Sequence, residues 1–174
     1  MSRVTHIYNP VERFVAGTVG QPGERTFFLQ ARTGSRITSV SLEKAQVAAL
    51  AQRVEMLIRD LRRTNPSIAL IPTSRDEGPL EQPIFEEFRV GVISLSWDEI
   101  KSLVCIECEE AGDESVQVDE EGDLLQVYLT PGAASGFATR SLIVVDAGRT
   151  ECPFCEIPID PQGHLCPRAN GYRR

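Results

Sequence analysis

The chain contains few of the residues on which active sites and nucleic-acid interfaces most often depend. Only two of its 174 residues are histidine, and aromatic side chains make up 6% of the sequence. Its formal net charge is −7. Charge-driven binding to nucleic acid relies on Lys and Arg that face phosphates, so this acidic balance argues against it.

Long hydrophobic runs are also absent from the sequence. No apolar stretch approaches the length that spans a bilayer, and residues 1–14 lack the apolar segment of a signal peptide. We therefore expect a cytoplasmic protein with reduced thiols and no membrane contact. Because 41% of its residues are hydrophobic, the chain can bury an ordinary globular core.

The most informative residues that are present lie near the C-terminus. Cys152 and Cys155 are separated by two residues, and His164 and Cys166 by one. Three thiolates and one imidazole are ligand types that suit a tetrahedral Zn²⁺ ion. The sequence therefore predicts that these four side chains bind zinc, with a small hydrophobic or redox-active cluster as the alternative.

Four protein ligands leave no coordination position open for water, whereas catalytic zinc sites normally keep three protein ligands. We therefore expect a structural zinc knuckle. The sequence also lacks a Gly-x-Ser-x-Gly motif and a phosphate-binding glycine loop that ends in Lys-Ser/Thr. No catalytic residues and no cofactor other than zinc are predicted, so we expect that the protein is not an enzyme.

The rest of the chain has an α+β pattern in which three strands and a helix occur twice. The first set is expected at 14–19, 26–31 and 36–42 with a helix from Ser41 to Arg63, and the second at 85–95, 103–108 and 124–129 with a helix from Thr130 to Gly148. The predicted fold is two pseudo-repeated β-β-β-α units, each an antiparallel sheet with a packed helix, followed by the short zinc knuckle.

The two units match weakly when the second is shifted by 87 positions. Val40 then lies on Val127, and Leu42 lies on Leu129. Two unrelated amphipathic helices give similar matches by chance, so duplication and coincidence both stay open.

The expected domain organisation follows from these patterns. An α+β domain spans residues 1–148, with halves at about 1–65 and 84–148. The proline-rich segment 66–83 links the halves. Residues 149–174 form the zinc-binding tail.

Cys105 and Cys108 also have zinc-like spacing. On an extended strand, residues three apart point to opposite faces, so both thiols cannot grip one ion without a bend. Packing is the favoured interpretation, because free cysteine usually behaves as a small buried hydrophobe.

Two charged groups each allow two interpretations. The segment from Glu107 to Asp123 has nine carboxylates and no Lys or Arg, which is typical of a solvated loop or of a patch that docks a basic partner. Arg168, Arg173 and Arg174 either balance the charge of the metal site or contact phosphate or an acidic surface.

With these motifs located, the chain resembles an actinobacterial family of proteins of unknown function that includes the partitioning-associated protein ParJ. The resemblance rests on the segments Arg13-Phe-Val-Ala-Gly-Thr-Val-Gly-Gln-Pro-Gly23, Glu43-Lys-Ala-Gln-Val47, Glu87-Phe-Arg-Val-Gly91, Trp97-Asp98 and Cys152-Pro-Phe-Cys155 with Gly163-His-Leu-Cys-Pro-Arg-Ala-Asn-Gly-Tyr172. It implies a cytosolic protein without assigned enzymatic activity, and it suggests contact with a ParA-type ATPase in chromosome segregation. The two strand cysteines, Cys105 and Cys108, depart from the family pattern, which argues against a role in the metal site.

Two functions therefore remain open. The first is a protein-interaction or regulatory protein, with a ParA-type ATPase as the suggested partner. The second is a single-stranded nucleic-acid binder, because paired β-β-β-α units resemble PUR and Whirly folds, on whose sheets bases stack. The residues that would serve the second function are Phe14, Phe27, Phe28, Arg13, Arg25, Arg32 and Arg36. The net charge favours the first function.

Overall fold

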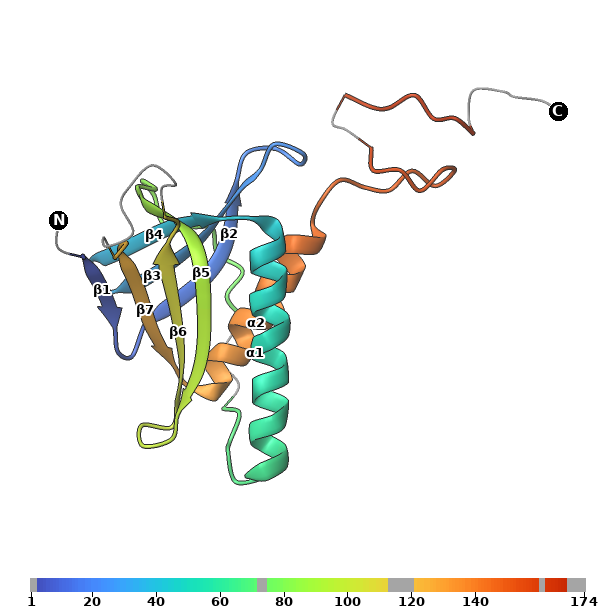
Figure 1. Ribbon diagram of the computed structural model, residues 1–174. Helices are drawn as coiled ribbons and strands as arrows, with labels where there is room; N and C mark the ends of the chain where they lie inside the picture. Colours follow the sequence, from blue (N-terminus) through green and yellow to red (C-terminus); the bar gives the residue numbers. More distant parts are fainter. Residues whose placement is uncertain (1–2, 72–74, 113–120, 160–161, 169–174) are drawn as a thin grey trace.

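The computed structural model describes residues 3–71, 75–112, 121–159 and 162–168. It confirms the α+β class, with a seven-stranded sheet and two helices (Figure 1). The elements are β1 (Thr5–Tyr8), β2 (Arg13–Val19), β3 (Thr26–Thr33), β4 (Arg36–Leu42), α1 (Lys44–Thr64), β5 (Glu86–Asp98), β6 (Leu103–Glu110), β7 (Leu124–Leu129) and α2 (Pro131–Asp146). The predicted order of strands and helices is therefore found, and the structure adds β1. Part of the acidic segment, residues 113–120, lies outside the described residues.

The strands form one mixed sheet in the order β1-β7-β6-β5-β4-β3-β2, in place of two separate antiparallel sheets. Strands β2 to β4 and β5 to β7 are antiparallel sets, and they join where β4 and β5 pair in parallel. The two outer strands, β1 and β2, follow each other closely in the chain, so the sheet must curl. In the connection between these two strands, the Val11 N–H donates to the Tyr128 carbonyl of β7 at 3.0 Å, and the Glu12 N–H donates to the Arg32 carbonyl of β3 at 3.1 Å. These bonds hold the β1 border of the sheet close to the β2 border.

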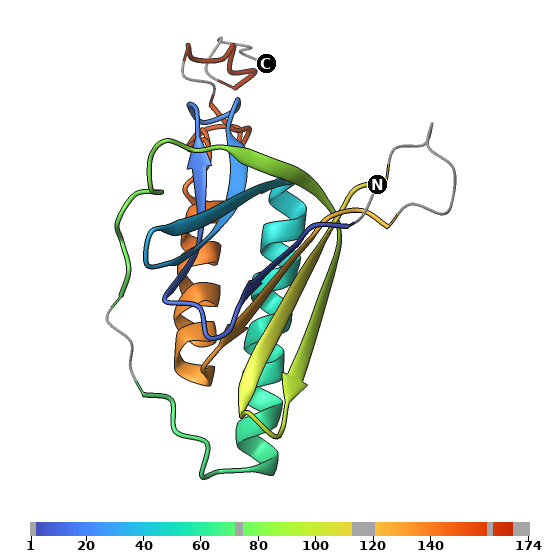
Figure 2. The same ribbon diagram turned by 90° about the vertical axis from the view of Figure 1, so that its left-hand side faces the viewer.

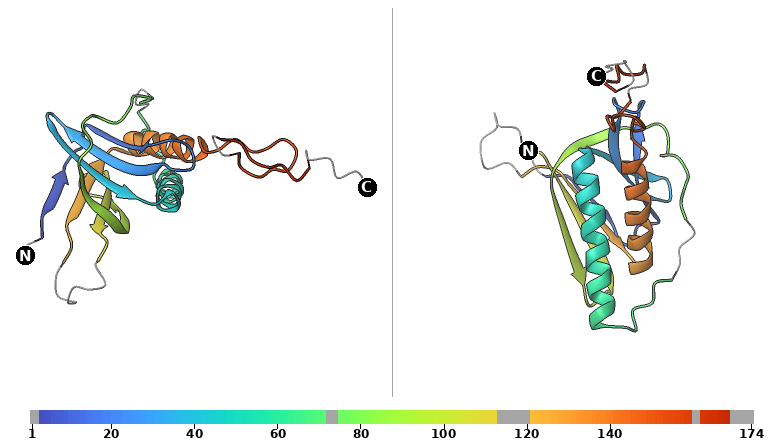
Figure 3. Two further views of the ribbon diagram at one scale, coloured as in Figure 1. Left: turned by 90° about the horizontal axis from the view of Figure 1, so that it is seen from above. Right: turned by 90° about the vertical axis from the view of Figure 1, so that its right-hand side faces the viewer.

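Both helices pack on one face of the curved sheet and run in opposite directions beside each other (Figures 1 and 3). The core lies between the helices and the sheet. The buried face of α1 consists of Val47, Leu50, Ala51, Val54 and Ile58, at the spacing expected of an amphipathic helix. From α2, the ring of Phe137 stacks on Phe14 of β2 with centroids 4.6 Å apart. Neither helix is long and apolar enough to cross a membrane, as far as the described chain extends.

The two helices begin at positions that correspond to each other in the proposed repeat. Their N-caps are Glu43 and Thr130, which are separated by the same 87 positions. The first helix was expected to start near Ser41 with Ser41 as its N-cap, and that N-cap is wrong, because the structure places it at Glu43. Ser41 belongs to β4 and its hydroxyl donates to Glu86 at 2.7 Å, whereas Gln46 caps the helix by accepting from the Glu43 N–H at 2.8 Å.

Between α1 and β5 the described residues form neither helix nor strand. We call the described residues of this segment, 66–71 and 75–85, the strap. Leu80 packs with Val15 and Phe28, whose side chains lie on the sheet face opposite the helices. Gln30 fixes the strap further, because its amide donates to the Glu81 carbonyl at 3.1 Å and accepts from the Glu81 N–H at 2.7 Å. The strap therefore covers part of the outer face of the sheet.

A partly buried charge network holds the strap to the folded body. The Asp76 carboxylate accepts from Arg13 Nε at 2.6 Å and from an Arg140 terminal nitrogen at 3.2 Å. The two arginine side chains are only 12% and 13% exposed. The hydrogen bond from Arg13 lowers the pKa of Asp76. One carboxylate from the strap thus pairs with cations from β2 and α2.

Candidate metal centre

The segment after α2 extends away from the sheet and helices (Figures 1 and 2). Its first part is a short hairpin: the Cys152 N–H donates to the Ile157 carbonyl at 3.0 Å, and the Ile159 N–H donates to the Thr150 carbonyl at 2.8 Å. These backbone bonds fix the turn that carries Cys152 and Cys155. The division of the chain at residue 148 stays a prediction.

Each pair of candidate ligands lies next to a residue in the left-handed backbone region. Glu156, directly after Cys155, has a φ of 62°, and Gly163, directly before His164, has a φ of 85°. The Glu156 N–H also donates to the Cys152 carbonyl at 2.8 Å. A left-handed residue reverses the chain tightly, so both turns point their ligand side chains toward the same space. In the chain that leads to Gly163, positions 160 and 161 lie outside the described residues.

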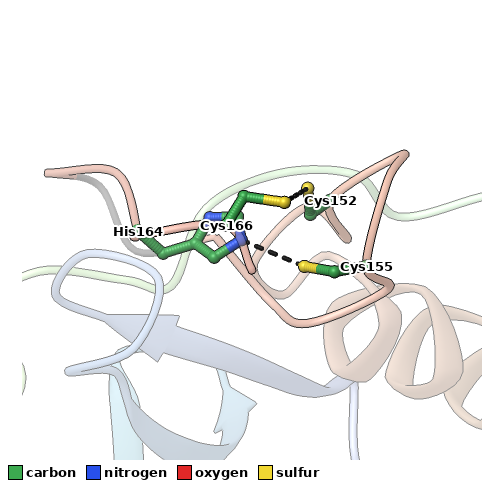
Figure 4. A group of neighbouring side chains, drawn as sticks. All are labelled: Cys152, Cys155, His164 and Cys166. Atoms are coloured by element: carbon green, nitrogen blue, oxygen red, sulfur yellow. Dashed lines mark hydrogen bonds between the residues drawn. The ribbon is translucent and has the colours of Figure 1, made fainter. Parts of the chain in front are cut away.

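The four predicted ligands come together in one cluster (Figure 4). Their ligating atoms all lie within 4.8 Å of one another. Cys152 Sγ is 3.7 Å from Cys166 Sγ, and Cys155 Sγ is 3.2 Å from His164 Nε2. All five cysteines of the chain are free thiols. The cluster therefore offers three sulfur atoms and one imidazole nitrogen to a single point.

The separation of the sulfur atoms of Cys152 and Cys166 fits a tetrahedrally coordinated ion. Zinc–sulfur bonds of about 2.3 Å place two sulfur ligands roughly 3.8 Å apart around a tetrahedral centre. The observed Cys152–Cys166 separation of 3.7 Å is close to that value. The donor set also suits zinc, because thiolate and imidazole are preferred over oxygen ligands by this ion. The cluster can hold a metal ion and is compatible with zinc.

The local electrostatics favour a thiolate at Cys152. Backbone N–H groups of Phe154 and then Cys155 hydrogen-bond to its sulfur and lower the pKa of the Cys152 thiol. Backbone N–H groups that point at a sulfur are a common feature around metal-bound cysteine, because they offset its negative charge. The turn therefore stabilises an anionic sulfur at Cys152, whereas burial raises the pKa of the Cys155 thiol.

Arg168 joins the two halves of the cluster. Its guanidinium donates to the Phe154 carbonyl at 3.0 Å, within the first cysteine turn. The sequence offered charge balance or an external anion as its role, and nothing in the local pattern indicated this backbone contact. Arg173 and Arg174 lie outside the described residues.

Cys105 and Cys108 do not belong to the cluster. Cys108 is fully buried in the core between sheet and helices, whereas Cys105 lies outside that core and is hydrogen-bonded to Tyr128. The two thiols therefore have separate surroundings, as the alternation of strand side chains predicts.

Native protein should show this difference as slow alkylation at Cys108. Burial raises the pKa of the Cys108 thiol to about 12, so almost no thiolate forms at neutral pH. We expect iodoacetamide to leave Cys108 unmodified in folded protein and to label it in denaturant, as read by peptide mass spectrometry. Rapid labelling of Cys108 in the native state would contradict the core placement.

Comparison with known protein families gives a match over most of the chain. The family model described as a protein of unknown function, DUF3090, matches residues 6–166, which include most of β1, β2 to α2 and all four candidate ligands. Neither the curated proteins nor the solved structures contain a significant match. Because the family model covers most of the sequence, this chain belongs to the DUF3090 family.

Proposed function

We propose that the protein is a non-enzymatic, cytoplasmic interaction protein whose C-terminal segment is a structural zinc knuckle. The observation that carries the proposal is the cluster of Cys152, Cys155, His164 and Cys166, with all ligating atoms within 4.8 Å. Four protein ligands complete a tetrahedral shell, and closed shells of this kind hold short segments in a fixed shape. Among the described residues this is the one group of three or more potential ligands.

The surface of the knuckle supports a role in binding another protein. Phe154 lies between the first two cysteines and is 61% exposed, and Leu165 lies between His164 and Cys166 and is 86% exposed. Ile157, after the first turn, is 47% exposed. A bound ion would hold these apolar side chains in place, which lowers the entropy cost of using them in an interface.

The partner we propose is a ParA-type ATPase, which the family resemblance suggests. The knuckle extends beyond the folded body (Figure 1), and its exposed apolar side chains are accessible to such a protein. The sheet and helices would then serve as the rigid base that carries the knuckle.

Single-stranded nucleic acid is the competing ligand. Its binding needs exposed aromatic rings beside free cations. In the first antiparallel set, Phe14, Phe27 and Phe28 are all buried, at 6%, 5% and 8% exposure. Two of the arginines there are engaged within the chain, since Arg13 binds Asp76 and Arg25 donates to the Val144 carbonyl at 3.1 Å. These contacts favour the protein partner.

Direct binding measurements distinguish the two functions. Zinc-loaded full chain should bind the immobilised ParA-type ATPase of the same organism in biolayer interferometry. We expect Leu165→Ala to weaken that binding by about tenfold, because an exposed apolar anchor would lose its contact. The matched control is Met56→Ala, which removes a similarly sized exposed side chain from α1 and should leave binding unchanged.

The same preparation should be titrated with labelled single-stranded DNA and RNA over a salt series. Absence of binding to the ATPase would overturn the partner assignment. Micromolar binding to either nucleic acid that weakens steeply with salt would overturn the interaction-protein proposal in favour of the nucleic-acid function.

A further inference from the structure

The second half of β5 has a hydrogen-bonding partner on one side only. Along that side, β6 pairs with β5 as far as Asp98. On the other side β4 pairs only near the start of β5, at Glu86 and Arg89. Within the described chain no strand occupies that side from Val92 to Trp97, which we call the open edge. Figure 2 shows β5 continuing past β4 along the border of the sheet.

Local features of the chain end the β4–β5 pairing at this point. The register of β5 shifts between Val90 and Val92. The amide of Gln46, on α1, donates to the carbonyls of Val90 and Gly91 at 3.2 Å each, so it takes acceptors that a strand would use. A Cβ atom at Gly91 would lie 2.7 Å from the Cα of Ala111, which explains glycine at the bulge. Specific contacts within the fold therefore keep β4 from pairing further along β5 and leave this edge open.

The open edge lacks the residues that normally protect a sheet border. Lys, Arg and Pro are absent from Val92 to Trp97, although such residues commonly block edge-to-edge pairing. The side chains alternate: Val92, Ser94 and Ser96 are exposed, and Ile93, Leu95 and Trp97 are half-buried against the core. An uncharged, alternating edge can accept a further strand with the same alternation.

We propose that the open edge pairs with the open edge of a second copy of this chain, antiparallel and about a two-fold axis at Ser94. In this register Ser94 faces Ser94 of the second copy. Ile93 faces Leu95, and Val92 faces Ser96, so half-buried residues meet half-buried ones and exposed residues meet exposed ones. The result is a symmetric dimer in which one sheet continues through both copies.

Charges at the two ends of the open edge select this partner and this direction. Arg89 lies just before the edge, where it also contacts Glu43, and Asp98 lies just after it, where it also contacts Lys101. Antiparallel pairing brings the Asp98 carboxylate of each copy to the end that carries Arg89 of the other. Parallel pairing would instead bring like charges together. The edge is thus complementary to itself in the antiparallel direction.

Sedimentation equilibrium of the full chain under reducing conditions tests the dimer. Wild-type protein should show a concentration-dependent monomer–dimer equilibrium. We expect Ser94→Lys to raise the dimer dissociation constant by roughly tenfold or more, because two lysines would face each other across the axis. Ser94→Thr is the matched control, since it adds a β-branched neutral side chain and should preserve the dimer. Circular dichroism of each variant checks that it is folded.

Crosslinking tests the register independently. Ser94→Cys should form an intermolecular disulfide joining position 94 of both copies under mild oxidation, whereas Ser96→Cys should not crosslink to itself because it faces Val92. Peptide mass spectrometry separates these products from crosslinks of the native cysteines. A wild-type chain that stays monomeric at every concentration, or a dimer that Ser94→Lys leaves intact, would overturn the proposal.

Discussion

Full chain purified under reducing conditions should contain about one zinc ion per molecule, and Cys155→Ser should retain less than about a tenth of it, since structural zinc relies on its complete ligand set. Serine is close in size to cysteine but does not supply a thiolate at neutral pH. The loss should also loosen the segment from Thr150 to Arg168, because few contacts other than the ligands join its two halves. Elemental analysis measures the metal, and limited proteolysis measures the order of the segment.

Cys105→Ser is the matched control for this experiment. It makes the same substitution at a cysteine outside the cluster, so zinc content should stay at the wild-type value. A reductant must be present throughout, because thiolates released from a metal oxidise readily. A tail that resists proteolysis in metal-free protein, or full zinc content in Cys155→Ser, would contradict a structural zinc site.

Replacement of Asp76 by alanine should destabilise the fold by about 1–2 kcal/mol, because the lost carboxylate is 37% exposed and both arginines keep backbone carbonyl acceptors. Arg13 and Arg140 would remain largely buried without the carboxylate that joins them. The strap would lose its charged contact with both arginines, but Arg13 would still donate to the Pro79 carbonyl and Arg140 to the backbone carbonyl of residue 76. Urea-induced unfolding gives the free energy. The neighbouring Glu77→Ala, which removes a 71% exposed carboxylate, should change it by less than about 0.5 kcal/mol.

The Asp76 contribution should also depend on pH in a defined direction. Its pKa is lowered in the folded protein, mainly by the hydrogen bond from Arg13, relative to the ordinary value of 3.8. The stabilisation is therefore fully present above the ordinary pKa and is lost as the pH falls through the lowered one. The stability difference between wild type and Asp76→Ala should hold at neutral pH and shrink in acid below pH 3.8. A difference that stays constant into acid would contradict the ion pair.

Local patterns were sufficient to predict six strands and both helices. The spacing of Val47, Leu50 and Val54 marks the buried face of α1, and the Thr130-Pro131 pair marks the start of α2. Each of these signals depends only on neighbours in sequence. The expected helix start at Ser41 was wrong because Ser41 pairs with Phe28 in the sheet and its hydroxyl donates to Glu86. Neither interaction can be inferred from the residues next to Ser41 in sequence.

Long-range features could not be predicted in the same way. Strand β1 has four residues and is held by parallel pairing with β7, far away in sequence. The charge network of the strap depends on Asp76. This residue lies in a polar, proline-rich segment whose sequence predicts only a linker. No periodicity connects Asp76 to Arg13 or Arg140. Contacts of this kind appear only when the whole sheet has formed.

The candidate metal centre could be predicted from the sequence because its four ligands lie within a short segment. Spacing and ligand chemistry alone selected the residues that the structure brings together. The backbone geometry could not be predicted in the same way, because Glu156 adopts a left-handed conformation that non-glycine residues rarely take.

X-ray absorption spectroscopy at the zinc edge tests the central claim most directly, because it counts the atoms bound to the ion. A closed site formed by Cys152, Cys155, His164 and Cys166 predicts three sulfur atoms at about 2.3 Å and one nitrogen at about 2.0–2.1 Å. A shell with a water oxygen and only three protein ligands would contradict the structural role and would favour a catalytic zinc site instead.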